Sequence, residues 1–182
     1  MAPRNPSDTE NKLLLLHAID RLDAVTTHQI LLFMVENNLM DYISLQLLLA
    51  ELMDAGLLRK RTHAIGALYS PTREGLDSLE MFRSRVPHSR LAAVDDIAEA
   101  WRLRFRREKQ MLSQFSEENG EFVVRLRLLE WDLDLLDIRL TVPTHKQAQR
   151  FCDAWIAQAP NIYAHLMHSL GEGDTAPTSK EQ

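Results

Sequence analysis

The sequence has one cysteine, Cys152, among its 182 residues. A single thiol cannot form a disulfide within the chain, so nothing here calls for an oxidising compartment, and we expect a cytoplasmic protein. Long apolar runs are missing too. No stretch approaches the roughly 20 apolar residues of a membrane-spanning helix, and residues 1–10 lack the apolar segment of a signal peptide. We therefore expect no membrane partner.

Glycine and proline are scarce, at 6 and 7 residues, which excludes collagen-like and low-complexity chains. With 45% hydrophobic and 26% charged residues, the composition is that of an ordinary globular protein. Positive charge is not in excess either, since the formal net charge is -5. Neither half of the chain is basic, so any contact with nucleic acid must be local.

What the first part of the chain does contain is helical periodicity. Apolar residues at spacings of three and four predict a helix over 8–22, a second from Thr26 or Thr27 to about residue 38, and a third over 45–55. Ser44 is the expected N-cap of the third helix. Gly56 follows it, where a left-handed C-cap residue is common.

The period then changes to that of strands. Residues 57–62 and 68–71 form short extended runs on either side of a loop with a glycine, which predicts a hairpin. Thr72 is placed to cap a fourth helix that ends before Pro87. We therefore expect a domain over 8–85 with the order helix, helix, helix, strand, strand, helix.

The second part, 86–170, is predicted to hold a linking helix over 89–103 and a small sheet. Asn119-Gly120 is a strong signal for a type I′ hairpin turn, and alternating apolar residues flank it. The segment 105–118 fits either a strand or a continued helix. The expected fold class is α+β: a three-stranded antiparallel sheet packed by two helices, 144–158 and 160–170, with disordered termini at 1–7 and 171–182.

Two segments carry a family resemblance. SLQLLLAELMDAGLLRKR (44–61) and LYSPTREGLDSL (68–79) resemble bacterial winged helix-turn-helix regulators, with a helix ending in Gly-Leu, a basic strand and a Tyr-x-x-Thr-x-x-Gly return. The runs NGEFVVRL, IRLTVPTHKQAQRFCDAW and IYAHLM resemble a family of uncharacterised bacterial proteins that joins a winged helix to a small α+β domain. The resemblance implies the fold and a DNA-binding regulator.

In a winged helix the third helix enters the major groove and the hairpin contacts the DNA backbone. Carried onto this chain, the resemblance places residues of the third helix near bases and basic residues near phosphates. The first set is Tyr42, Ser44, Gln46 and Leu47, and the second is Arg59, Lys60, Arg61, His63 and Arg73. The third helix departs from the pattern, because 45–56 holds no Lys or Arg and includes Glu51 and Asp54.

A second basic run lies at 102–109. On a strand, alternation would gather several of its cations on one face as a phosphate-binding stripe. On a helix, the same run is a solvated end that pairs with acids such as Glu99 and Glu108. The residues concerned are Arg102, Arg104, Arg106, Arg107 and Lys109.

Catalytic and metal chemistry have weak signals. His165 and His168 have a helical spacing that can hold a metal, but no third ligand is near in sequence. Cys152 fits a buried thiol, and the acids at 132, 134 and 137 fit a turn between strands better than a cation site. The aromatic residues of the second part fit a core, with a small-molecule pocket as the alternative; they are Phe122, Trp131, Phe151, Trp155 and Tyr163. We expect no cofactor and no enzyme.

The leading hypothesis is a regulator that binds double-stranded DNA as a homodimer, since a single module makes a small DNA interface of roughly 600 to 1,000 Å². The pairing surface would be the linking helix, through Leu91, Val94 and Trp101, or the second domain. Two alternatives stay open. The winged helix could grip a protein partner through Leu47 without binding DNA, or the second domain could sense a small-molecule effector.

Overall fold

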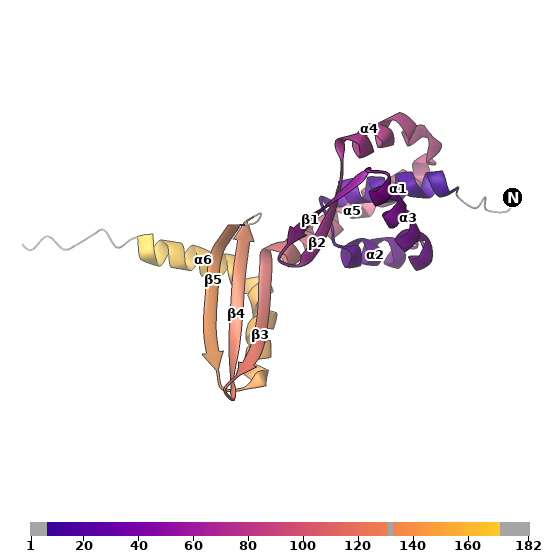
Figure 1. Ribbon diagram of the computed structural model, residues 1–182. Coiled ribbons are helices and arrows are strands. Elements are labelled where there is room, and N and C mark those ends of the chain that lie inside the picture. The colour runs from indigo at the N-terminus through magenta and orange to yellow at the C-terminus, as the bar shows by residue number, and fades with distance from the viewer. Residues whose placement is uncertain (1–6, 131–132, 172–182) are drawn as a thin grey trace, which may run out of the picture. The chain divides into compact units, whose positions relative to one another are not determined.

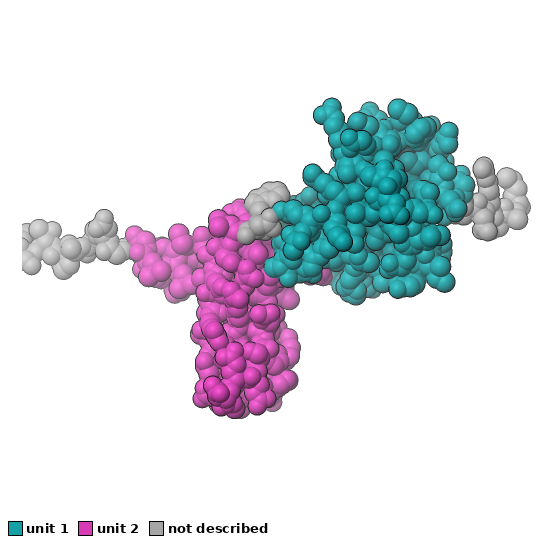
Figure 2. Space-filling view, viewed as in Figure 1, with its two compact units in different colours: residues 1–106 teal, residues 107–182 magenta. Residues whose placement is uncertain are grey.

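The computed structural model describes residues 7–130 and 133–171 and has an α+β architecture (Figure 1). The chain divides into two compact units, residues 1–106 and 107–182, which Figure 2 colours separately. The expected boundary at 85/86 therefore differs from the observed one at 106/107. Each unit has its own hydrophobic core.

Three helices open the first unit: α1 (Asp8–Leu22), α2 (Thr27–Glu36) and α3 (Tyr42–Asp54). The expected cap of the third helix was wrong. Asp41 is the N-cap, since its Oδ1 accepts a hydrogen bond from the Ser44 backbone N–H at 3.0 Å. The helix therefore begins at Tyr42, three residues before the predicted start, and Ser44 lies in its first turn.

The predicted hairpin is confirmed as β1 (Leu58–His63) paired antiparallel with β2 (Gly66–Pro71). Val25, between α1 and α2, joins the hairpin as a single bridging residue. The Val25 N–H donates to the Tyr69 carbonyl at 3.0 Å, and the Tyr69 N–H donates to the Val25 carbonyl at 2.7 Å. This pair of hydrogen bonds fastens the hairpin to the segment between α1 and α2.

A Thr and a Gly fix the root of the hairpin where α4 (Arg73–Phe82) begins. The Thr72 hydroxyl accepts from the Gly75 N–H at 3.1 Å and donates to the Gly56 carbonyl at 2.8 Å. Gly75 lies so close to Leu57 that an added Cβ would meet the Leu57 carbonyl oxygen at 2.1 Å. Within the Tyr-x-x-Thr-x-x-Gly pattern, Thr72 and Gly75 thus each have a physical role, and the Tyr69 side chain packs against the core.

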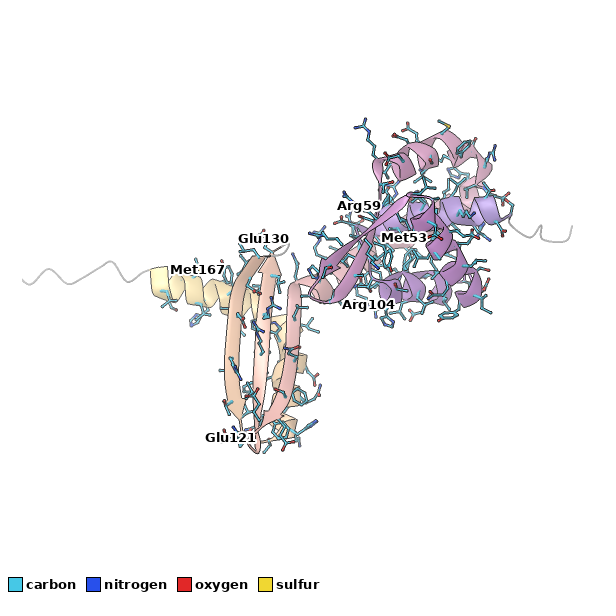
Figure 3. All side chains as sticks on the ribbon, in the orientation of Figure 1. Met53, Arg59, Arg104, Glu121, Glu130 and Met167 are labelled. Carbon is cyan, nitrogen blue, oxygen red and sulfur yellow. The ribbon has the colours of Figure 1, made fainter. Side chains whose placement is uncertain are left out.

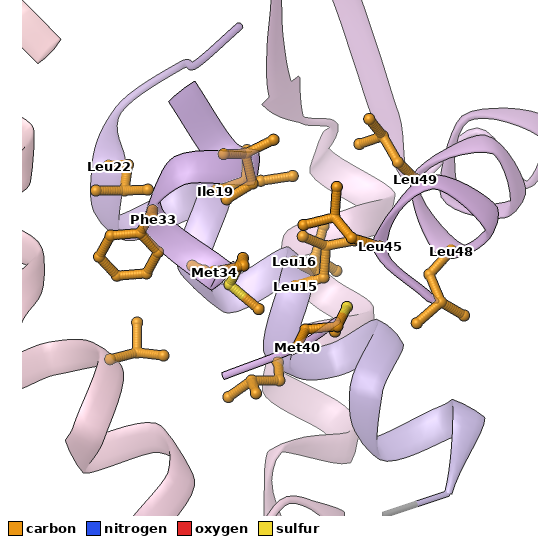
Figure 4. Packing of buried hydrophobic residues seen from close by; sticks show 14 of the residues in the cluster. Leu15, Leu16, Ile19, Leu22, Phe33, Met34, Met40, Leu45, Leu48 and Leu49 are labelled. Carbon is orange, nitrogen blue, oxygen red and sulfur yellow. The ribbon is translucent and has the colours of Figure 1, made fainter. Parts of the chain in front are cut away.

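The core of the first unit lies among α1, α2 and α3, as Figure 4 shows in close-up. The linking helix, α5 (His88–Gln110), contributes to the same core. Leu91 and Val94 are 4% and 0% exposed, and Trp101 packs edge-on against Phe33 with ring centroids 5.8 Å apart. The apolar side of α5 therefore belongs to the first unit, and Leu91 and Val94 are not available as the pairing surface that we expected.

The second unit contains a three-stranded antiparallel sheet in the order β3 (Met111–Glu118), β4 (Glu121–Glu130) and β5 (Leu133–Val142). Asn119 and Gly120 have φ angles of 54° and 82°, which confirms the turn predicted from these two residues. The segment 105–118, for which the sequence allowed either a strand or a continued helix, contains both. It is helical up to Gln110, where α5 ends, and β3 follows directly.

One helix, α6 (His145–Gly171), covers one face of this sheet, so the expectation of two separate helices was wrong. Pro160 lies inside it and removes one backbone donor, which leaves the carbonyl of Ile156 without an intrahelical partner. Both residues are exposed, so water can replace that hydrogen bond. Packing of Trp155 and Ala159 before the proline keeps the helix on the sheet.

The expected disorder of the termini falls mostly on 1–6 and 172–182, which lie outside the described residues. The expectation was wrong for Ser7, which is the N-cap of α1, and for Gly171, which belongs to α6. The Ser7 hydroxyl caps α1 by accepting from the Glu10 N–H at 3.2 Å, and Gly171 is the last residue of α6.

Candidate nucleic-acid interface

The hairpin presents the basic residues that the sequence singled out. Arg59, Lys60 and Arg61 are exposed, and the Arg59 Nε donates to the Ser70 Oγ at 3.2 Å. Successive strand residues point to opposite faces, so Arg59 and Arg61 share one face and Lys60, opposite Tyr69, lies on the other. The three cations are therefore at the surface, but Lys60 points away from the face that Arg59 and Arg61 share.

The hairpin is positively charged because it has basic residues and no acidic ones. The stretch 56–73 contains four Lys or Arg residues and no Asp or Glu, in a chain of net charge -5. Arg73, the first residue of α4, is exposed at the end of this stretch, and His63 is half-buried at the end of β1. A local positive surface thus exists on a protein that is acidic as a whole.

The predicted reader helix, α3, is only partly polar at its surface. Tyr42 and Leu47 are 56% and 59% exposed, whereas Ser44 and Gln46 are half-buried. The Ser44 hydroxyl donates to the Asp41 Oδ2 at 2.6 Å, and this bond lowers the pKa of the Asp41 carboxyl. Ser44 therefore serves the helix cap, which leaves Gln46 as the amide group on this face.

The sequence interpretation missed Ile43, which is 77% exposed beside Tyr42. A signal for it existed, because Ile43 falls outside the apolar spacing of Leu45, Leu48 and Leu52, which are buried. One of the two acids on this helix is neutralised: Glu51 forms a salt bridge of 2.8 Å with Lys12 of α1. The exposed start of α3 therefore combines the apolar side chains of Tyr42 and Ile43 with the carboxylate of its N-cap, Asp41.

The second basic run lies at the C-terminal end of α5 and is helical, so it is not a strand, and its pairing with Glu99 and Glu108 stays a prediction. The Arg104 guanidinium lies over the Trp101 ring, 4.9 Å from its centroid. The Arg102 Nε is buried and has no hydrogen-bond partner. At 100° per residue, Arg102, Arg106 and Lys109 fall within an arc of about 60° and share one side of α5, while Arg104 and Arg107 point to other sides.

A polar network joins α1 to α5 inside the first unit. His17 is 1% exposed, and its Nε2 lies 2.9 Å from the Asp95 Oδ1, to which the Arg21 Nε also donates at 2.7 Å. Burial lowers the pKa of His17, although the nearby Asp95 carboxylate acts in the opposite direction. Arg83 approaches the same carboxylate at 3.9 Å. This network holds α5 against α1.

The remaining candidates for metal and thiol chemistry lie as follows. Within 7–130 and 133–171, no three His, Cys, Asp or Glu residues are grouped to hold a metal. Cys152 is buried, and burial raises the pKa of its thiol. Asp134 and Asp137 form salt bridges with Arg127 and Arg125, while position 132 lies outside the described residues. The acids of this segment thus neutralise cations on the sheet.

The aromatic residues of the second unit are mostly structural. Trp155 is 1% exposed, and its Nε1 donates to the Arg127 carbonyl at 3.0 Å. Phe122 and Tyr163 pack against the same core, Phe151 is 40% exposed, and position 131 lies outside the described residues. A hollow on the outer face of the sheet is open, and it is lined in part by the paired side chains of Arg125 and Asp137.

The comparisons with known proteins add one match. The family model described as a domain of unknown function, DUF4364, matches residues 11–170. No curated protein and no solved structure matches the chain. In the part of the chain that the structure describes, no helix is long and apolar enough to cross a membrane. Because the match covers most of its length, the chain belongs to the DUF4364 family.

Proposed function

We propose that the first unit is a winged-helix module that binds double-stranded DNA, and that the protein acts as a transcriptional regulator. The observation that carries this proposal is the hairpin of 58–71. It is exposed, basic and free of acids, and the Val25–Tyr69 hydrogen bonds fasten it to a three-helix core. A rigid basic hairpin beside a short helix is the arrangement with which such modules grip DNA.

The roles follow from position and chemistry. Arg59, Lys60, Arg61 and Arg73 are placed for phosphates, because cations at the surface release condensed counterions when they meet the backbone. The start of α3 offers Gln46 for an adenine edge. The apolar side chains of α3 suit contact with thymine methyl groups.

Three phosphate contacts from the arginines, or four with Lys60 on the other face of the hairpin, predict a specific salt dependence. The logarithm of the binding constant should fall with the logarithm of salt concentration with a slope of about -3 to -4, so raising salt from about 50 to 200 mM weakens binding roughly a hundredfold. Fluorescence anisotropy with a pool of random duplexes measures both quantities on the full chain. Absence of binding at about 50 mM salt would refute the proposal.

A matched pair of variants tests the hairpin itself. Arg59→Glu/Arg61→Glu should abolish measurable binding, because two phosphate contacts become repulsions. Lys146→Glu/Arg150→Glu changes the net charge by the same amount on an exposed part of α6 and should bind as the unmodified protein does. Equal loss in both variants would indicate a non-specific effect of net charge.

A second function, contact with a protein partner, is favoured by one observation. Tyr42, Ile43 and Leu47 form an exposed apolar group at the start of α3, which is unusual for a DNA-reading helix and typical of protein interfaces. An Ile43→Glu/Leu47→Glu variant would lose a protein partner, whereas Arg59→Glu/Arg61→Glu would retain it. The opposite pattern, with loss only on charge reversal in the hairpin, supports DNA.

A further inference from the structure

The second half of α6 continues the helix beyond the region that it buries. The residues of α6 that are fully buried are Ala148, Cys152, Trp155 and Ala159. After Ala159 the same side of the helix carries apolar side chains that the sheet covers only partly or not at all. Figure 1 shows the C-terminal end of α6 extending past the edge strand β5, and Figure 3 labels Met167 on this end.

This face is apolar along its whole length and is only partly covered. Met167 and Leu170 are 57% and 78% exposed, and Ile156 is 49% exposed one turn before the proline. At 100° per residue, six apolar side chains fall within an arc of about 140°. They are Ile156, Ile162, Tyr163, Leu166, Met167 and Leu170. We name this arc the α6 stripe.

The segment that carries the α6 stripe also lacks formal charge. Residues 154–171 contain no Asp, Glu, Lys or Arg, although 26% of the chain consists of these four types. Charged side chains keep an exposed helix soluble. The absence of charge over 18 residues of this helix therefore calls for an explanation. A partner that covers this helix supplies one.

We propose that the partner is a second copy of this chain, which packs its own α6 stripe against the first. A two-fold interface places the same patch on both sides, so a charged side chain near the axis would meet its own kind. The uncharged segment avoids this repulsion entirely. An anionic membrane surface is the less suitable occupant, because helices that lie on membranes carry Lys or Arg on the polar face, and 154–171 has neither.

The buried area fits a weak dimer. Three exposed side chains that bury about 100 Å² each, and three half-buried ones that bury about 50 Å² each, give about 450 Å² per chain, or about 900 Å² in total, which is the size of a transient interface. The other surface considered from the sequence, the apolar side of α5, is used inside the first unit. This proposal holds whatever the first unit binds, so it can fail without affecting the DNA proposal.

The test measures the mass of the full chain by sedimentation velocity and equilibrium. The unmodified protein should sediment at about twice the 21.0 kDa of one chain. Met167→Glu/Leu170→Glu should sediment as one chain, with a dissociation constant raised at least about a hundredfold, because it places two charges per chain in the interface. Both positions are exposed, so neither substitution should unfold the protein.

A matched control adds the same charges away from the α6 stripe. Ala154→Glu/Asn161→Glu lies on the opposite side of the helix, since Asn161 precedes Leu170 by nine residues, or half a turn after whole turns are removed. Both residues are exposed, and this variant should remain a dimer. A single-chain mass for the unmodified protein, or an unaltered dimer in Met167→Glu/Leu170→Glu, would overturn the proposal. Binding of single chains to phosphatidylglycerol vesicles would identify a membrane as the occupant instead.

Discussion

Replacing Gly75 with alanine tests whether the root of the hairpin is as tightly packed as its geometry indicates. An added Cβ would lie 2.1 Å from the Leu57 carbonyl oxygen, whereas a carbon and an oxygen in contact need about 3.3 Å. The start of α4 must therefore move by about 1 Å. That movement also disturbs the hydrogen bond of 3.0 Å from the Thr72 N–H to the Leu57 carbonyl.

The expected cost follows from three effects. Overpacking against a backbone atom costs about 1 to 3 kcal/mol, and weakening of the Thr72 hydrogen bond adds about 1 kcal/mol. Alanine favours a helix by about 1 kcal/mol relative to glycine, which offsets part of this. The balance for Gly75→Ala is a loss of about 2 kcal/mol, or a fall in melting temperature of about 10 °C for a unit of this size.

Circular dichroism melting of the full chain measures the change. Asp77→Ala, an exposed position in the same helix, is the control and should melt within about 2 °C of the unmodified protein, since surface substitutions change stability little. If Gly75→Ala melted at or above the temperature of the unmodified protein, helix propensity would outweigh the contact. The close approach of Gly75 to Leu57 would then not constrain the hairpin.

Two further predictions concern buried polar groups. Trp155→Phe removes the donor to the Arg127 carbonyl and should cost about 1 to 3 kcal/mol in a urea titration; an unchanged midpoint would mean that water replaces the bond. His17 has a lowered pKa, so the unfolded chain binds a proton at higher pH than the folded protein and stability should fall as pH drops below 6.5. Melting temperatures between pH 7.5 and 5 should therefore decline more steeply than in His17→Gln, and parallel declines would contradict this assignment.

Features that depend on local backbone chemistry were predictable from the sequence. Gly56 has the left-handed φ of 69° expected after a helix, and Asn119-Gly120 forms the expected turn. Both predictions succeed because few residue types tolerate these conformations, whatever the rest of the fold does. The exposure of Arg59 and Lys60 followed likewise from a polar run on a short strand.

Features that depend on tertiary packing were not predictable. Asp41 and Ser44 are both good N-caps, and only the position of the chain before α3 decides between them. The apolar spacing on α5 shows that one face is covered, but not whether a core or a second chain covers it. The Val25–Tyr69 pairing joins residues 44 positions apart and involves backbone groups alone, so no side-chain pattern announces it.

The distribution of acids links the two proposals. The chain has 26 Asp and Glu residues, so 36 residues of average composition would hold about five. The stretches 56–73 and 154–171 together make up 36 residues and hold none. The first combines this absence with four cations, which suits a polyanion, and the second combines it with exposed apolar side chains, which suits an uncharged copy of itself. Asp or Glu residues in either stretch would weaken binding of the partner proposed for that stretch. In the rest of the chain, the acids produce the net negative charge, which keeps the protein from binding polyanions over its whole surface.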